Sequence, residues 1–308
     1  MLNELVEKFN SKQNIYSVVK SMLPHPKYWP KKLHEIRMDR YYFEEFGKHA
    51  DFKNPKTFNE KVMWYMIYFS DEVATTVIDK VRFKKYISEK IGDGYTAELY
   101  GVWDNAEDID FSNVEVPFVL KSNCSGDGQN MAIITEKSQI TDGLKNKMRE
   151  WFKWQNTFIN GSSNAYYRVK PQVLAEEYLE GIDGTLADYK FFCFDGEPYC
   201  AYTSVDHFTS DGLFAFYDMD WNVMDVNYGD FPSGAIEKPK HFEEMKRIAA
   251  VLSEGFPFIR VDFYETTKGL KVGELTLFSG GGLRPFNPDS FDYELGEKFV
   301  LPSKKRNK

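Results

Sequence analysis

The sequence is poor in the residues that build disulfide scaffolds and zinc sites. Its three cysteines, Cys124, Cys193 and Cys200, are odd in number and show neither CxxC nor Cys/His metal spacing, which excludes both kinds of structure. We therefore expect a reducing compartment. No segment is apolar enough to span a membrane, and residues 1–14 mix Glu and Lys with apolar residues, unlike a signal peptide. The cytoplasm is the expected location.

The chain also lacks an excess of positive charge. It has 39 Lys and Arg against 47 Asp and Glu, a formal net charge of −8, and no basic stripe, so nucleic acid is not an expected partner. Aromatic residues, in contrast, make up 17% of the 308 residues. Such a chain can bury a large core, which excludes disorder and indicates two domains or one domain with substantial subdomains.

The first third of the chain has the pattern of helices. Thr57 and Glu60 form a capping-box sequence, which predicts a helix from residue 58. A second helix is predicted over residues 76–91, with Lys80 in its first turn and Gly92 at its end.

After residue 111 the pattern changes to short apolar runs separated by turn residues. Helical spacing recurs twice, at 140–152 and 241–254. The predicted strands cover residues 116–120, 131–134, 171–179, 189–194, 199–203, 258–264 and 270–276. This order predicts helices together with a sheet of antiparallel character.

One predicted strand ends at Lys121 and enters a loop of small residues, 122–129, which contains Gly126 and Gly128. Glycines let backbone N–H groups close around phosphate oxygens, and a lysine at the strand end supplies a positive partner. This pattern favours a triphosphate site. A plain hairpin with a polar turn explains the loop equally well, and neither a Walker A nor a Rossmann fingerprint is present.

Two strands near the C-terminus carry charged residues. Alternation places Arg260 and Asp262 on one face of the first, and Val272, Glu274 and Thr276 on one face of the second. A connecting loop of odd length, centred on Lys268, would set Asp262 opposite Glu274.

Two facing carboxylates repel unless a cation lies between them, and hard oxygen ligands near phosphates favour magnesium. Arg260 beside them would neutralise transferring or carboxylate oxygens. The alternative is a solvent-facing charged stripe, but the neighbouring Phe258, Val261, Phe263 and Leu275 indicate burial on both faces.

An apolar run at 173–175 leads into Glu176 and Glu177 and leaves through Tyr178 and Leu179. At such a crossover, a carboxylate can accept a hydrogen bond from the adenine amino group, and an exposed backbone N–H can donate one to the adenine ring. Without the other motifs, a strand end with solvated acids would be the preferred interpretation.

Taken in order, these motifs resemble the ATP-grasp superfamily. A longer series of segments is similar to its teichuronopeptide-biosynthesis branch, the TupA-like proteins, over about residues 35–302. The segments are NPKTFNEK, DKVRFKKYISEKIG, LYGVWD, VLKSN, AEEYL, DYKFFCFDGEP, GELT and Gly280–Gly282. Several long motifs in the correct order are more specific than any single one.

The resemblance implies roles for individual residues. Lys80 and Lys121 would hold the α and β phosphates, and the loop 122–129 would fold over them. Magnesium would be bound by Asp262, Glu274 and Thr276, where Thr276 stands in place of the Asn of many ATP-grasp enzymes. The nucleotide-binding set is completed by Ser122, Ser125, Gly126 and Gly128 in the loop, by Glu176, Glu177, Tyr178 and Leu179 at the adenine, by Asp188 at the ribose and by Lys190 at the phosphates.

The same resemblance implies a catalytic set of Arg260, Arg284 and Lys190. The two arginines would hold the substrate carboxylate or its acylphosphate. One departure from the branch is Cys124, since its relatives tend to carry His at that position of the loop.

The fold implied is ATP-grasp: two α+β subdomains that grip ATP, over residues 79–180 and 181–308, behind a mostly helical region at 1–78. The implied activity is an ATP- and magnesium-dependent carboxylate–amine ligase that works through an acylphosphate. It would attach an amino acid to a uronic acid or peptidic polymer in cell-surface polysaccharide biosynthesis. Expected partners are small-molecule carboxylates and amines, with a saccharide or lipid-linked saccharide as a further acceptor.

Two alternatives come from other classes. The DxD sequences at 108–110 and 218–220 imitate the metal site of a sugar-nucleotide glycosyltransferase, although the second is better explained as a hairpin turn. A nucleotide-binding protein without catalysis would keep the lysines but would not need paired carboxylates.

Overall fold

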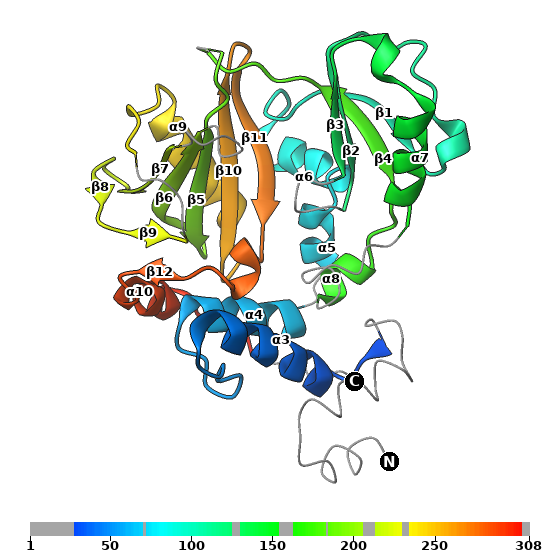
Figure 1. Cartoon of the computed structure of the whole chain (residues 1–308). Coiled ribbons are helices and arrows are strands. Elements are labelled where there is room, and N and C mark those ends of the chain that lie inside the picture. Colours follow the sequence, from blue (N-terminus) through cyan, green and yellow to red (C-terminus); the bar gives the residue numbers. More distant parts are fainter. Residues whose placement is uncertain are drawn as a thin grey trace.

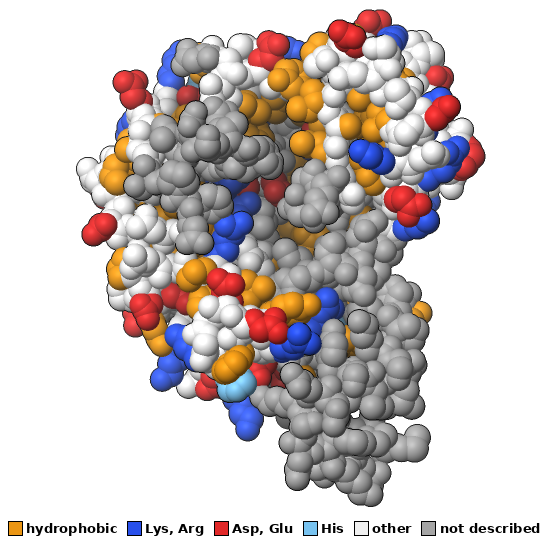
Figure 2. All heavy atoms as spheres, in the orientation of Figure 1, with side chains coloured by type: hydrophobic (Ala, Val, Ile, Leu, Met, Phe, Trp, Pro, Cys, Tyr) orange, Lys and Arg blue, Asp and Glu red, His pale blue; other side chains and the backbone are white. Residues whose placement is uncertain are grey.

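The computed structural model describes residues 28–69, 72–124, 130–153, 163–182, 184–205, 213–229 and 234–303. Two antiparallel sheets stand beside each other, and helices α5 (Glu72–Ile78) and α6 (Arg82–Ile91) lie between them (Figure 1). Each sheet with its helices forms one of two lobes. The surface is hollowed between the lobes, and acidic and basic side chains are visible in the hollow (Figure 2). The predicted α+β class is confirmed.

The larger sheet has six strands in the order β11-β10-β5-β6-β7-β8. Helix α9 (Phe242–Ser253) covers one face of it with the apolar stripe that the sequence predicts. The strands are β5 (Asp188–Phe194), β6 (Glu197–Val205), β7 (Leu213–Asp218), β8 (Val223–Met224), β10 (Ile259–Thr266) and β11 (Gly269–Thr276). The predicted strands at 189–194, 199–203, 258–264 and 270–276 are thus confirmed, with small shifts at their ends.

The smaller sheet has four strands in the order β1-β4-β2-β3. They are β1 (Leu99–Trp103), β2 (Phe118–Ser122), β3 (Met131–Ile134) and β4 (Val173–Glu177). Helix α7 (Asp142–Trp151) packs on its outer face and closes a separate small core with Phe118, Leu120 and Trp151. The short elements η2 (Ala106–Asp108), η3 (Lys137–Gln139) and α8 (Asn164–Tyr167) connect these parts.

A helical layer lies below the larger sheet in Figure 1. It contains α3 (Lys31–Phe46), α4 (Phe58–Tyr68), η4 (Ser279–Gly282) and α10 (Ser290–Lys298), next to the short pair β9 (Asn227–Tyr228) and β12 (Phe286–Asn287). The predicted capping box is confirmed: the Thr57 hydroxyl accepts from Glu60 N, and the Glu60 carboxylate accepts from Thr57 N, each over 3.2 Å. Chain segments more than two hundred residues apart therefore meet around α4.

The predicted helix over residues 76–91 is wrong in one respect, because two helices replace it. α5 ends at Ile78 and α6 begins at Arg82. The carboxylate of Asp79 accepts from the backbone N–H of Val81 over 3.0 Å, a local bond that competes with a continuous helix. Lys80 therefore lies in the turn between the helices. The predicted end at Gly92 is confirmed, with a φ of 92° and its N–H bonded to Ser88 O.

None of the helices in the described part of the chain combines the length and the apolar character that crossing a membrane requires.

Candidate functional site

The acidic pair lies on the two neighbouring strands β10 and β11. Asp262 is the direct register partner of Glu274, as the sequence predicts. The connecting loop does not have the predicted odd length. Instead, a two-residue turn followed by a bulge at Gly273 produces this register. A Cβ at Gly273 would come within 2.2 Å of the Tyr264 ring, so glycine permits this bulge.

The bulge also changes which side chains share a face. Glu274 pairs with Asp262, whereas Val272 pairs with the residue after Asp262, and consecutive residues of a strand face opposite sides. The prediction that Val272 shares a face with Glu274 is therefore wrong. Thr276 does share that face, because it pairs with Arg260, two residues before Asp262.

Asp262 lies in a buried network of charges. Its Oδ1 accepts from Arg260 Nε over 2.7 Å, and its Oδ2 accepts from Arg260 Nη2 over 2.6 Å. Lys190, on β5, lies 3.2 Å from Asp262 Oδ2 and also forms an ion pair with Asp188. Burial opposes ionisation of Asp262, but the two cations outweigh it and hold its pKa below the usual range. Burial raises the pKa of Asp188 in spite of Lys190.

The guanidinium of Arg260 extends this network toward η4. Its Nη1 donates to Tyr202 Oη over 3.1 Å and to Ser279 Oγ over 3.3 Å, and its Nη2 donates to Thr276 Oγ1 over 3.1 Å. Arg284 approaches η4 as well, since a Cβ at Gly280 would lie 2.9 Å from its Cγ. The two arginines of the predicted catalytic set therefore both lie against η4.

On the smaller sheet, one buried carboxylate holds two lysines. Glu176 on β4 forms ion pairs with Lys121 on β2 and with Lys84 on α6, the latter over 2.8 Å from Lys84 Nζ to Glu176 Oε2. Burial opposes ionisation of Glu176, yet both lysines together keep its pKa below the usual value. Lys84 also donates to Ala97 O over 2.6 Å. Sequence analysis missed Lys84, although its position four residues after Lys80 was a usable signal.

Lys80 connects the end of β2, on the smaller sheet, to the acidic pair on the larger sheet. Its Nζ lies 3.4 Å from Glu274 Oε1, and its backbone N–H donates to Asn123 O over 3.0 Å. The turn between α5 and α6 therefore places a cation against the larger sheet while its backbone bonds the end of β2. The contacts thus bring four predicted residues together, Lys80, Lys190, Asp262 and Glu274, whereas Lys121 is held on the smaller sheet by Glu176.

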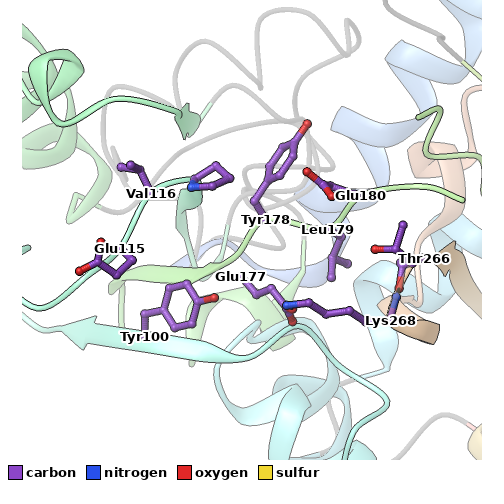
Figure 3. A pocket seen from close by; sticks show the side chains of 11 residues that line it. Tyr100, Glu115, Val116, Glu177, Tyr178, Leu179, Glu180, Thr266 and Lys268 are labelled. Atoms are coloured by element: carbon purple, nitrogen blue, oxygen red, sulfur yellow. Dashed lines mark hydrogen bonds and ion pairs between the residues drawn. The ribbon is translucent and has the colours of Figure 1, made fainter. Parts of the chain in front are cut away.

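Glu177 faces the opposite side of β4 from Glu176. It forms an ion pair with Lys268, at the tip of the β10–β11 hairpin, and its Oε2 accepts from Glu98 N over 3.2 Å. A cavity of about 260 Å³ opens here (Figure 3). Its lining consists of Tyr100, Glu115 to Pro117, Glu177 to Glu180, and Thr266 to Lys268.

The four residues predicted to bind adenine therefore divide between two places. Glu177, Tyr178 and Leu179 line the cavity, whereas Glu176 joins the two lysines. Along β10 the cavity lies about 13 Å from Asp262, four strand residues away. The charges of the larger sheet therefore converge at the acidic pair and not at the cavity.

The predicted loop can be placed only in part. Ser122 is buried, and its Oγ accepts from Cys124 N over 3.5 Å. Burial raises the pKa of the Cys124 thiol. Ser125, Gly126 and Gly128 lie outside the described residues.

The second DxD sequence forms the predicted hairpin turn. The Asp218 carboxylate accepts from the backbone N–H groups of Asp220 and Asn222 over 2.9 and 2.8 Å. Asp110, in the first DxD sequence, accepts from Ser112 N over 2.8 Å. Both motifs are thus occupied in local turns. Within the described ranges, no group of three or more His, Cys, Asp or Glu side chains is arranged to hold a metal ion.

Comparison with protein families gives one match over most of the chain. A family model described as TupA-like ATPgrasp matches residues 60–300. A search of curated proteins gave no match.

Among solved structures, the chain is similar to several ATP-grasp ligases. D-alanine–D-alanine ligase from Bacillus anthracis aligns with 18% identity over 66% of this chain and 57% of that one, with a TM-score of 0.40. The Helicobacter pylori enzyme aligns with 16% identity over 75% of this chain and 60% of that one, with a TM-score of 0.44. The ATP-grasp ligase PsnB in complex with its minimal precursor aligns with 13% identity over 67% of this chain and 53% of that one, with a TM-score of 0.39. This chain thus spans little more than half the length of these solved proteins.

Proposed function

The chain belongs to the TupA-like ATP-grasp family and has its fold, and from this premise we propose that it is an ATP- and magnesium-dependent carboxylate–amine ligase. One observation carries the proposal. Asp262 and Glu274 lie in register on adjacent strands, with Arg260 beside them and Lys80 against Glu274. A protein that only bound nucleotides would not need such a pair of carboxylates, whereas phosphoryl transfer does.

The residues fit magnesium by the chemistry of their donors. Asp262 and Glu274 supply hard carboxylate oxygens, and one or two carboxylates together with substrate phosphates are the usual environment of this ion. Thr276 offers a hydroxyl on the same face, although that hydroxyl accepts from Arg260. When bound, the ion would neutralise charge on the transferring phosphoryl group. We assign Asp262 and Glu274 as its principal ligands and Thr276 as a weaker one.

The smaller sheet offers a suitable surface for the nucleotide. Met131 and Ile133 are the register partners of Lys121 and Val119, so all four share one face. Met131 and Ile133 are 41% and 45% exposed, and exposed apolar side chains beside a lysine are typical of a wall that contacts a purine. We propose that the base lies against this wall or in the adjoining hinge segment 176–179. The ribose would lie near Asp188, and the phosphates would be held by Lys80, Lys121, Ser122 and the loop 125–129.

The reacting groups belong to the larger sheet. Lys190 would hold the γ-phosphoryl group, and the guanidinium of Arg260, joined by Arg284, would orient a substrate carboxylate against it. A carboxylate oxygen attacks the γ-phosphorus, ADP leaves, and an acylphosphate forms. An amine then attacks the acyl carbon, so that phosphate leaves and an amide bond results.

Our proposal for the substrates rests on the family resemblance and not on the geometry. We propose that an amino acid is joined to a uronic acid or peptidic polymer during cell-surface polysaccharide biosynthesis in the cytoplasm. A free or lipid-linked saccharide would serve as the acceptor. No contact in the described part of the chain selects one acceptor over another.

The test is to measure ADP release with ATP and magnesium while amino acids and uronic-acid sugars are offered together. Glu274→Gln is the cleaner variant, because the Glu274 side chain is 36% exposed and its loss leaves no buried charge unpaired. It should lower turnover about 10²- to 10³-fold, while ATP still binds but without the strengthening that magnesium gives. Asp262→Asn should also lower turnover, and ATP should still bind to this variant.

Glu243→Gln, on the exposed surface of α9, is the matched control and should leave turnover unchanged. Turnover with a sugar nucleotide and none with ATP would overturn the proposal in favour of a glycosyltransferase.

A further inference from the structure

A fully buried asparagine follows directly after β2, where the predicted phosphate loop begins. Asn123 has no exposed surface. Its side chain and backbone together tie the end of β2, which it follows, to two other segments: the α5–α6 turn and the entry to β4. A buried amide of this kind is expensive to leave unpaired, so its position is closely determined by these partners.

The first connection is to the turn that carries Lys80. Asn123 Nδ2 donates to Asp79 Oδ1 over 3.1 Å, and Asn123 O accepts from Lys80 N over 3.0 Å. The same Asp79 oxygen accepts from Val81 N. One carboxylate oxygen therefore fixes both the start of α6 and the amide of Asn123.

The second connection is to the segment that enters β4. Asn123 Nδ2 donates to Lys170 O over 3.0 Å, and its Oδ1 accepts from Gln172 N over 2.8 Å. The backbone N–H of Asn123 donates to Gln172 O over 3.0 Å. This segment continues directly into the strand that carries Glu176, the partner of Lys121.

We propose that Asn123 is a positioning residue of the nucleotide site, which sets the spacing between Lys80, the end of β2 and β4 through its bond to Asp79. The inference rests on the proposed function, because it assigns a cause to nucleotide affinity. Asparagine is required for a physical reason: its amide donates to Asp79 and Lys170 O while its oxygen accepts from Gln172 N. Aspartate at this position would instead set a carboxylate against Asp79.

The experiment measures binding of a non-hydrolysable ATP analogue with magnesium, together with the KM values of a functioning assay. Asn123→Asp should weaken analogue binding roughly tenfold and raise the KM for ATP, while the KM for the acceptor stays unchanged. The double variant Asn123→Asp/Asp79→Asn should recover most of the affinity, because an asparagine at 79 can donate to the new carboxylate. A merely structural role would change the KM for the acceptor along with the KM for ATP.

Gln172→Ala is the matched control. Its side chain bonds the exposed Asp104, while its backbone bonds to Asn123 remain, so analogue binding should not change. Wild-type affinity in folded Asn123→Asp, or an equal loss in Gln172→Ala, would overturn the inference. If Asn123→Asp does not fold, the double variant decides: recovered binding supports the inference, and lost binding in a folded double variant overturns it. Failure of the wild-type protein to bind the analogue would contradict the proposed function itself.

Discussion

The two sheets hold their charged residues in different settings. In the larger sheet, the strand that carries Asp262 and Arg260 is packed into a continuous aromatic core that includes Phe192, Phe258 and Phe263, all fully buried. The smaller sheet has only its own small core under α7, and its edge strand β3 exposes apolar side chains. We infer that the charged network of the larger sheet is rigid and that the smaller sheet is more easily displaced; under the proposed function, the first would hold the reacting groups and the second would cover the nucleotide.

The largest effect should follow from removing a charge from the larger sheet. Arg260→Ala leaves the fully buried Asp262 with Lys190 as its remaining strong cationic partner. Removing one partner of a buried ion pair costs about 3–5 kcal/mol of stability. The free energy of unfolding, measured by urea denaturation, should fall by that amount. A loss below 1 kcal/mol would show that this network is not the rigid element that the comparison assumes.

A core substitution in the smaller sheet should act locally. Phe118→Ala removes a fully buried ring from the small core and should cost about 3 kcal/mol. Hydrogen exchange should then accelerate in β2 and β4 while β5 and β10 stay protected. Equal acceleration in both sheets would mean that the two cores unfold as one unit.

Glu176→Gln should reduce stability by about 2 kcal/mol at pH 7, because Lys84 and Lys121 lose a charged hydrogen-bond partner. The folded protein holds the pKa of Glu176 below its ordinary value of 4.5. Its contribution to stability is therefore complete above pH 4.5 and is lost as the pH falls through the folded-state pKa. The difference between wild type and variant should narrow on acidification below pH 4.5, and a constant difference would contradict the assignment.

The smallest effect should come from the contact between the hairpin tip and the hinge. The Lys268 side chain is 66% exposed, and the buried Glu177 keeps its bond from Glu98 N, so Lys268→Ala should lower the melting temperature only slightly. The cavity beside Glu177 loses its cation, and we expect a small change in ATP affinity, measured by calorimetry. A large drop in melting temperature would show that this contact is a major link between the two lobes.

Local rules recovered much of this arrangement from the sequence. The capping box at Thr57 and the end of α6 at Gly92 depend on neighbouring residues, and both are confirmed. The facing of Asp262 and Glu274 is also confirmed. Its cause could not be predicted, because the bulge at Gly273 depends on how the Tyr264 ring packs.

The remaining parts depend on contacts between distant segments. The Lys84–Glu176 pair joins residues 92 positions apart in sequence, and alternation within one strand could not assign Glu176 to the lysines and Glu177 to the cavity. The break at Asp79 was missed because helical periodicity continues across it. The predicted domain boundaries at 78/79 and 180/181, and the roles of the individual site residues, remain predictions.

Calorimetric titration of the wild-type chain with an ATP analogue, with and without magnesium, would show whether Asp262 and Glu274 belong to a magnesium–nucleotide site. We predict saturable binding of one analogue per chain that is strengthened by magnesium, and loss of that strengthening in Glu274→Gln. Binding that magnesium does not change, or no binding at all, would contradict this assignment.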